Sequence, residues 1–380
     1  MNWCGFIINQ LIALSNTICK SLFYFNEANG ALKRSGISDH RFDERETWWE
    51  TVTFVGIILL SSAYIISNQI AMSREVKRIF TPKTSNENEI AEIAPSWLTR
   101  LEQSLEWPAS FWKTIVGGQS FFRFSYQFLY AASELKIVSL SISGALTAVC
   151  FYSAMRCNYS FYKNKKTFVS NRLLPISQQP SNELTHINET SCTCVYAHSL
   201  ASIFAVMTFA LYFNSADYFG PHLSNHIKPL LSEASNKTTG GIAGLIAVVI
   251  GDFFIAGSTQ MSYAFRLRKD WEPHRVREPS GRWGAGDTVD LIASFAKTVT
   301  SAMSLMAITY EPFQLSGSLS CAAIAFPGNF FCEAGTLFRG SPFVRAGRCL
   351  GFHRENEDEN ESIENSSVTL NPRYGYGAVN

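Results

Sequence analysis

The sequence is poor in charged residues. Asp, Glu, Lys and Arg make up 17% of its 380 residues, against about 25% in an average soluble protein. Acidic and basic residues nearly balance, which leaves a formal net charge of +1. Because 46% of the chain is hydrophobic, this composition excludes a wholly disordered protein and a polybasic nucleic-acid-binding protein. We therefore expect no nucleic acid among its partners.

Motifs of common enzymes and metal sites are also missing. The sequence has no His-Glu-x-x-His pair, no Gly-x-Ser-x-Gly elbow and no phosphate-binding loop. It therefore gives no sign of a zinc protease, an α/β-hydrolase or a P-loop nucleotide hydrolase. Its nine cysteines include no Cys-x-x-Cys pair, and their number is odd. These features indicate free thiols in a reducing compartment, and we expect neither a metal ion nor a cofactor.

Several stretches without charge are long enough to cross a membrane. A helix needs about 20 mostly apolar residues to span the hydrocarbon core of a bilayer. We predict spans at 51–73, 114–133, 137–156, 195–216, 239–265 and 290–310. A further uncharged stretch begins at Pro312, and Met1–Cys19 could form either an anchor or an additional span. The sequence therefore predicts an all-α, polytopic membrane protein.

The chain divides into three regions. Residues 1–50 form an N-terminal region with a possible membrane anchor, 51–345 form the membrane domain, and 346–380 form an acidic tail. Six acidic residues lie between Glu355 and Glu364. Such a run repels itself and buries nothing, so we expect the tail to be disordered.

Basic residues and loop lengths suggest how the helices are arranged. Arg74, Arg156 and Arg266 each follow an odd-numbered span closely, which places the ends of the odd spans on one common side. The second and third spans are joined by almost no loop, whereas the gaps before and after them are each near forty residues. This alternation predicts a six-helix bundle built from three helix pairs.

Three short stretches resemble the mitochondrial carrier family. They are GGIAGLIAVVI at Gly240–Ile250, RWGAGD with Gly284 and Asp287, and LFRGSPFVRAG at Leu337–Gly347. The resemblance implies three repeats of two helices each and the transport of a solute. Carriers end each odd helix with Pro-x-Asp/Glu-x-x-Lys/Arg, and of this motif only Arg74 fits here.

The acidic tail resembles the Glu-rich translocation signal of bacterial type IV secretion effectors. Together with the carrier-like membrane domain, it implies an effector that inserts into a mitochondrial or other organelle membrane of a host cell. The expected partners are then a lipid membrane and either a small anionic solute or a host membrane protein.

Ionisable residues inside predicted spans mark the candidate site, because a charge in the bilayer is costly. The candidates for solute binding are Arg123, Asp252, Lys297 and His198, together with Arg74 directly after the first span. Cations outnumber the single carboxylate, which favours an anionic solute such as a nucleotide, a phosphate or a carboxylate. An alternative is that Asp252 and Lys297 form an ion pair that only holds helices together.

Two other functions stay open at this point. A carrier-like fold could act as a membrane serine hydrolase, for which Ser67, flanked by Asn68 and Gln69, lies in the most polar setting. It could also be a non-catalytic host-binding protein that uses the loops at 74–113 or 157–194.

Overall fold

The computed structural model describes residues 3–34, 48–80, 97–171, 192–227, 237–271 and 285–334. All regular secondary structure in these ranges is helical. The helices are α1 (Trp3–Arg34), α2 (Trp48–Phe80), α3 (Trp97–Ser133), α4 (Lys136–Asn171), α5 (Cys192–Ile227), α6 (Lys237–Trp271) and α7 (Ala285–Glu333). The predicted all-α fold is confirmed. The Leu337–Gly347 stretch and the tail at 346–380 lie outside the described residues.

Seven stretches of the described chain are long and apolar enough to cross a membrane: Phe6–Ala28, Thr51–Ser73, Lys136–Tyr159, Cys192–Ser215, Ile246–Arg268, Ala285–Tyr310 and Pro312–Glu333. These stretches make the chain an integral membrane protein with an all-α, polytopic bundle. Five of them match predicted spans. The predicted span at 114–133 is absent from this set, while Phe6–Ala28 and Pro312–Glu333 exceed the six helices that three pairs require.

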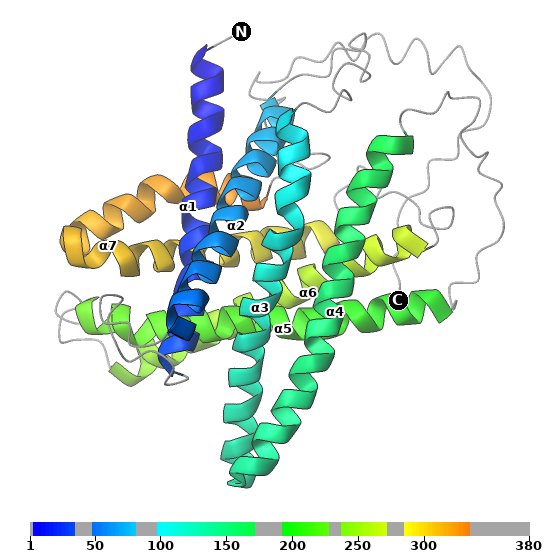
Figure 1. The fold of residues 1–380 in the computed structure, drawn as a ribbon. Helices are drawn as coiled ribbons and strands as arrows, with labels where there is room; N and C mark the ends of the chain where they lie inside the picture. Colours follow the sequence, from blue (N-terminus) through cyan, green and yellow to red (C-terminus); the bar gives the residue numbers. More distant parts are fainter. Residues whose placement is uncertain are drawn as a thin grey trace.

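The helices form two crossed layers (Figure 1). In the first layer α1, α2, α3 and α4 run alternately down and up, and each contacts its neighbour in sequence. In the second layer α5, α6 and α7 lie across them, and α7 packs on α1 while α5 packs on α3 and α4. The bilayer normal can therefore be parallel to the helices of only one of the two layers.

Helix α7 is two helices joined by a sharp reversal. Gln314 has φ 54° and ψ −172°, values that break the helix two residues after Pro312. The second half folds back along the first (Figure 1). The Ser294 hydroxyl donates to the carbonyl oxygen of Glu333 at 3.2 Å, and the Phe295 ring lies 6.1 Å from that of Phe330. The end of α7 is therefore held beside its beginning.

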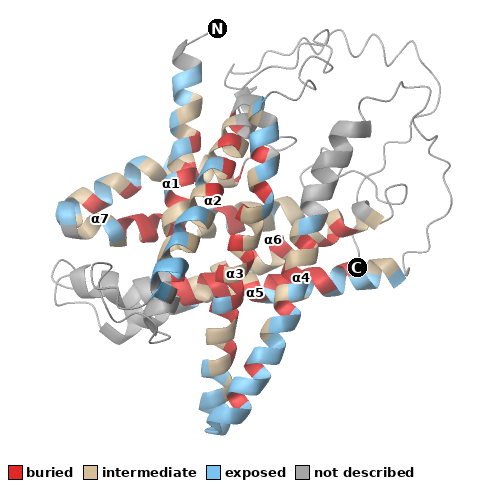
Figure 2. Ribbon diagram, in the orientation of Figure 1, coloured by how far each residue is buried: buried red, intermediate tan, exposed pale blue. Residues whose placement is uncertain are grey.

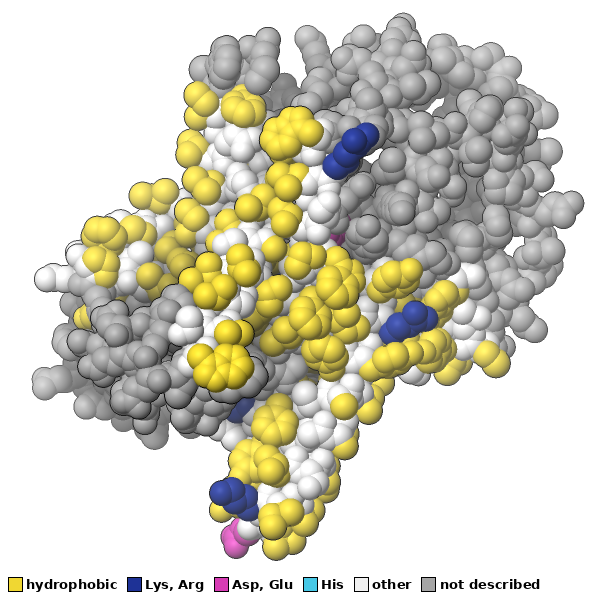
Figure 3. Space-filling model, in the orientation of Figure 1, with side chains coloured by type: hydrophobic (Ala, Val, Ile, Leu, Met, Phe, Trp, Pro, Cys, Tyr) yellow, Lys and Arg dark blue, Asp and Glu magenta, His cyan; other side chains and the backbone are white. Residues whose placement is uncertain are grey.

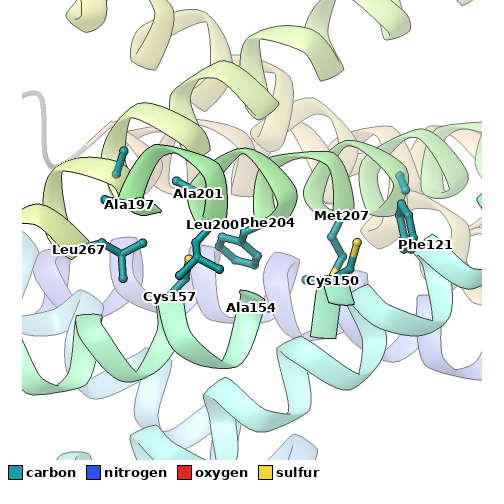
Figure 4. Packing of buried hydrophobic residues seen from close by; sticks show 12 residues of the cluster. Phe121, Cys150, Ala154, Cys157, Ala197, Leu200, Ala201, Phe204, Met207 and Leu267 are labelled. Atoms are coloured by element: carbon teal, nitrogen blue, oxygen red, sulfur yellow. The ribbon is translucent and has the colours of Figure 1, made fainter. Parts of the chain in front are cut away.

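Burial is concentrated where the two layers cross (Figure 2). The largest apolar core joins α3, α4, α5 and α6 and is built largely from small residues such as Ala154, Cys157, Ala197 and Ala201 (Figure 4). Small side chains let helix backbones approach closely. In a membrane this close packing drives helix association, because the hydrophobic effect does not favour helix–helix contact over helix–lipid contact. A second core centres on Phe23 of α1.

Large apolar side chains cover much of the outer surface (Figure 3). They are abundant on α2, on the first half of α1 and on the hairpin that joins α3 to α4. Many polar side chains are instead buried, among them Asn16, Lys20, Glu27 and Asn329. A protein in water normally shows the reverse pattern for its charged residues.

Candidate functional site

The centre of the polar interior is an ion pair between α1 and the end of α7. The Lys20 ammonium lies 3.0 Å from Oε1 of Glu333, and the two side chains are 9% and 14% exposed. Lys20 also donates to the Tyr212 hydroxyl of α5 at 3.0 Å. Three helices from both layers are thus joined at one cation.

A chain of amides extends this ion pair to α2. Asn16 lies one helical turn before Lys20, and its Nδ2 donates to Glu333 Oε1 at 3.2 Å and to Asn329 Oδ1 at 2.9 Å. The Nδ2 of Asn68 in turn donates to Asn16 Oδ1 at 3.0 Å. Amides donate and accept at once, so they can continue a buried hydrogen-bond network. We call Asn16, Lys20, Asn68, Tyr212, Asn329 and Glu333 the central cluster.

Two donors at the central cluster have no acceptor among the described residues. The Nδ2 atom of Asn329 is buried without a hydrogen-bond partner, and Asn329 as a whole is 0% exposed. Lys297 on the first half of α7 lies one turn after Ser294, on the side that meets Glu333. Its ammonium interacts electrostatically with Glu333, Lys20 and Asp290, yet no hydrogen bond is found for it in the described residues. Two lysines therefore share the Glu333 carboxylate.

A second polar group lies two turns further along α1. The Glu27 carboxylate accepts hydrogen bonds from Ser215 of α5 at 2.6 Å and from Ser120 of α3 at 3.1 Å. Asn214 donates to the carbonyl oxygen of Ser120 at 2.6 Å. Glu27 is 3% exposed, and Arg123 of α3 is near enough to interact with it electrostatically. This group joins α1, α3 and α5.

The structure separates the residues that the sequence suggests for solute binding. Lys297 lies at the central cluster, and Asp252 of α6 lies close enough to Tyr212 to interact with it electrostatically. Asp252 is 3% exposed, and its Oδ2 has no hydrogen-bond partner in the described part of the chain. Arg123 belongs to the Glu27 group. Asp252 and Lys297 are joined by no ion pair in these residues, so a pairing of the two does not hold α6 to α7.

The remaining candidates lie elsewhere. His198 is exposed on α5, and its Nδ1 lies 2.9 Å from Nε2 of Gln260 on α6. The side chain of Arg74 lies outside the described part of the chain. Ser67 is 7% exposed, but within the described ranges no His, Asp, Glu or Lys side chain forms a hydrogen bond with it. The described residues also contain no group of three or more His, Cys, Asp or Glu side chains that could hold a metal ion.

Lys20, Glu27 and Glu333 are not among the residues predicted from the sequence. Lys20 directly follows the N-terminal uncharged stretch, which ends at Cys19, and Glu333 closes another uncharged stretch. A signal was nevertheless present: Asn16, Lys20 and Glu27 recur at spacings of four and seven residues. Those spacings place all three side chains on one face of a helix.

Comparison with known proteins found no matching family model, no matching curated protein and no matching solved structure.

Proposed function

We propose that this protein transports a small anionic solute, which it binds at Lys297 and Asn329 beside the Lys20–Glu333 pair. One observation carries the proposal: in the described residues, the Nδ2 of Asn329 is a buried donor that no acceptor uses, beside the Lys297 ammonium, which interacts electrostatically with Glu333. Unpaired donors buried in a membrane protein are costly. A carboxylate or phosphate group of a solute supplies the missing acceptors.

Charge supports an anion in preference to a neutral solute. Lys20 already has Glu333 and Tyr212 as partners, whereas Lys297 interacts with Glu333 and Asp290 only electrostatically. In a medium of low dielectric constant an uncompensated charge costs several kcal/mol. An anion next to Lys297 offsets this cost, and the buried amide of Asn329 orients its oxygen atoms.

Asp252 gives the site a second, chemically different end. Its unpartnered Oδ2 can accept a hydrogen bond, and it lies on the Tyr212 side of the central cluster. A solute that carries a donor as well as its anionic group uses both ends. The proposed solute is therefore an anion with a hydroxyl, amino or amide group.

Uptake by the purified chain in liposomes tests the proposal. The probes are inorganic phosphate, malate, glutamate and ATP, each radiolabelled and offered separately. We expect uptake of at least one probe, at least tenfold slower in Lys297→Gln and in Asp252→Asn than in wild type. Slower uptake in Lys297→Gln shows that the solute needs the Lys297 cation, whereas Asp252→Asn tests the second end.

His198→Gln is the matched control. It changes an ionisable residue on an exposed face of α5, so it should insert normally and transport at the wild-type rate. Uptake that is unaltered in both Lys297→Gln and Asp252→Asn contradicts the site. Absence of uptake for every probe contradicts the function.

Delivery as an effector and insertion into a host mitochondrial membrane stay part of this proposal. They depend on the acidic tail and on the carrier resemblance, and the tail lies outside the described residues. Expression of a tagged copy in eukaryotic cells, followed by alkaline carbonate extraction, tests them. Carbonate-resistant signal in mitochondria supports the proposed location, and stable insertion elsewhere contradicts it.

A further inference from the structure

The hairpin of α3 and α4 projects beyond the crossing of the two layers (Figures 1 and 2). We call residues 126–149 the arm. Its surface is apolar (Figure 3), with Phe128 70%, Leu135 58% and Ile137 79% exposed. The α3 part of the arm does not belong to any of the seven apolar stretches.

The apolar surface of the arm is too wide for a partner that binds one side. On α4 the exposed apolar residues are Ile137, Val138, Leu140, Ile142, Leu146 and Val149. At 100° per residue they and their small neighbours cover roughly two thirds of the circumference, against the ≳100° stripe of a helix packed on one surface. Ser139, Ser143 and Cys150 are the buried positions and share the remaining side. A helix that exposes apolar side chains over two thirds of its circumference is suited to an apolar medium.

Polar groups at the turn of the arm are satisfied within it, whereas the Ser143 and Thr147 hydroxyls further along α4 have no hydrogen-bond partner among the described residues. The Ser133 and Ser141 hydroxyls donate to the carbonyl oxygens four residues earlier, at 2.8 and 2.9 Å. At the turn, the Glu134 amide donates to Tyr130 at 2.8 Å, and the Leu135 amide donates to the Ser133 hydroxyl at 3.4 Å. Hydrocarbon cannot hydrogen-bond a backbone group, so a reversal that satisfies its own amides is suited to a membrane.

The spacing of charges matches the thickness of a bilayer. Lys136 at the tip and Arg156 further along α4 are separated by twenty residues, or about 30 Å of helix, which is the thickness of the hydrocarbon core. No charged residue lies between them. For α3 the corresponding limits are Lys113 within the helix and Glu134 in the reversal that follows it. Arg123, between these limits, interacts with Glu27 of α1, so α3 has an acidic partner for its central cation.

Both ends carry amphipathic aromatic residues. Tyr126 and Tyr130 stack at 5.8 Å close to the tip. Near the other limit, Tyr196 of α5 stacks on Trp271 at 5.2 Å and interacts with Tyr152 and Arg156. Tyr and Trp are enriched at both interfaces of a membrane, where one end of the ring system is apolar and the other is hydrated.

We propose that α3 and α4 cross the bilayer as one hairpin, with residues 134–136 at one surface and Lys113 and Arg156 at the other. Lipid hydrocarbon chains then surround the arm, and Leu146, ten residues from each limit on α4, lies at the bilayer centre. A membrane normal along α3 and α4 leaves α5, α6 and α7 lying across it. This proposal is independent of the proposed transport.

Depth-dependent fluorescence quenching tests the position of the arm. A fluorescent amino acid replaces Leu146, Leu135 or Trp97, one at a time, in the full chain in liposomes. These side chains are exposed, so the label disturbs little packing. We expect Leu146 to be quenched most by lipid brominated near the chain end, Leu135 by lipid brominated near the carbonyl, and Trp97 by aqueous iodide. Leu146 and Trp97 labels that iodide quenches equally overturn the proposal.

Sidedness provides the second measurement. A clickable amino acid at position 97 or 135 is reacted with a membrane-impermeant dye in sealed microsomes that carry the inserted chain. A crossing hairpin places the two positions on opposite sides, so one reacts at once and the other only after detergent is added. Reaction of both positions in intact microsomes shows an arm that lies on one surface, and overturns the crossing.

Discussion

The central cluster and the arm distribute polarity in opposite ways. In the cluster Asn16, Lys20 and Tyr212 are at most 7% exposed and hydrogen-bond one another or their neighbours, whereas on the arm Phe128 and Ile137 are at least 70% exposed. The inner region depends on matched donors and acceptors, and the outer region depends on an apolar environment. The two regions should therefore fail for different reasons when they are mutated.

Breaking the ion pair should have the largest effect. Glu333→Gln leaves Lys20 and Lys297 without their shared carboxylate, and removal of one member of a buried pair costs about 3–5 kcal/mol. Thermal unfolding in detergent measures the loss of stability. The double variant Lys20→Met/Glu333→Gln should recover part of it, because it removes one of the stranded cations. A double variant less stable than Glu333→Gln contradicts this account.

A charge on the arm should have the next largest effect. Leu146→Arg places a cation at the proposed bilayer centre, where insertion costs about 2.5–3.5 kcal/mol. We expect less of the chain to resist carbonate extraction, while Trp97→Arg, outside the proposed hydrocarbon, behaves as wild type. If both variants extract alike, the arm is not surrounded by lipid.

Paired serine variants compare the buried Glu27 group with the arm without introducing a charge. Ser215→Ala removes a 2.6 Å hydrogen bond to the Glu27 carboxylate, and hydrogen bonds to charged groups contribute about 1.5–3 kcal/mol. Ser141→Ala removes a hydroxyl that bonds only to its own helix. It should change stability by less than about 0.5 kcal/mol, as surface substitutions do. Detergent melting curves of the two variants test the difference, and equal losses contradict it.

A pair of glycine variants should give the smallest but cleanest contrast. A Cβ at Gly328 would lie 2.9 Å from Ser15 Cβ, at the contact of α7 with α1, so Gly328→Ala should cost about 1–3 kcal/mol by overpacking. Nothing lies within 4 Å of a Cβ at Gly144 on the arm. Gly144→Ala should stabilise the helix by about 0.5–1 kcal/mol. Measured melting temperatures that move in the same direction contradict this contrast.

Much of the helical fold could be predicted from the sequence. The predicted span at 51–73 coincides with Thr51–Ser73, and the short link between the second and third predicted spans is the two-residue reversal between α3 and α4. Long uncharged segments have few alternatives to a helix in a membrane, because every backbone group must be satisfied within the segment. Lys297 and Asp252 were found for a related reason, since an ionisable residue in such a segment is conspicuous.

The site could be predicted only in part. Lys20 and Glu333 are 313 residues apart, and each follows or closes an uncharged stretch, so neither stood out by itself. The reversal at Gln314, which returns the end of α7 to Ser294 and α1, has a weak signal in Pro312 and none in its spacing. Hydropathy also gave no indication that α5, α6 and α7 lie across the first four helices.

The sequence by itself determined that this chain is helical, that it belongs in a membrane and where most of its apolar segments begin and end, because these properties depend on local composition and length. The tertiary structure decided which buried polar groups meet. Lys20 finds Glu333, Lys297 faces the same carboxylate and Arg123 faces Glu27. These contacts depend on the direction in which each helix runs relative to the others. Close packing of small side chains between helices fixes that direction.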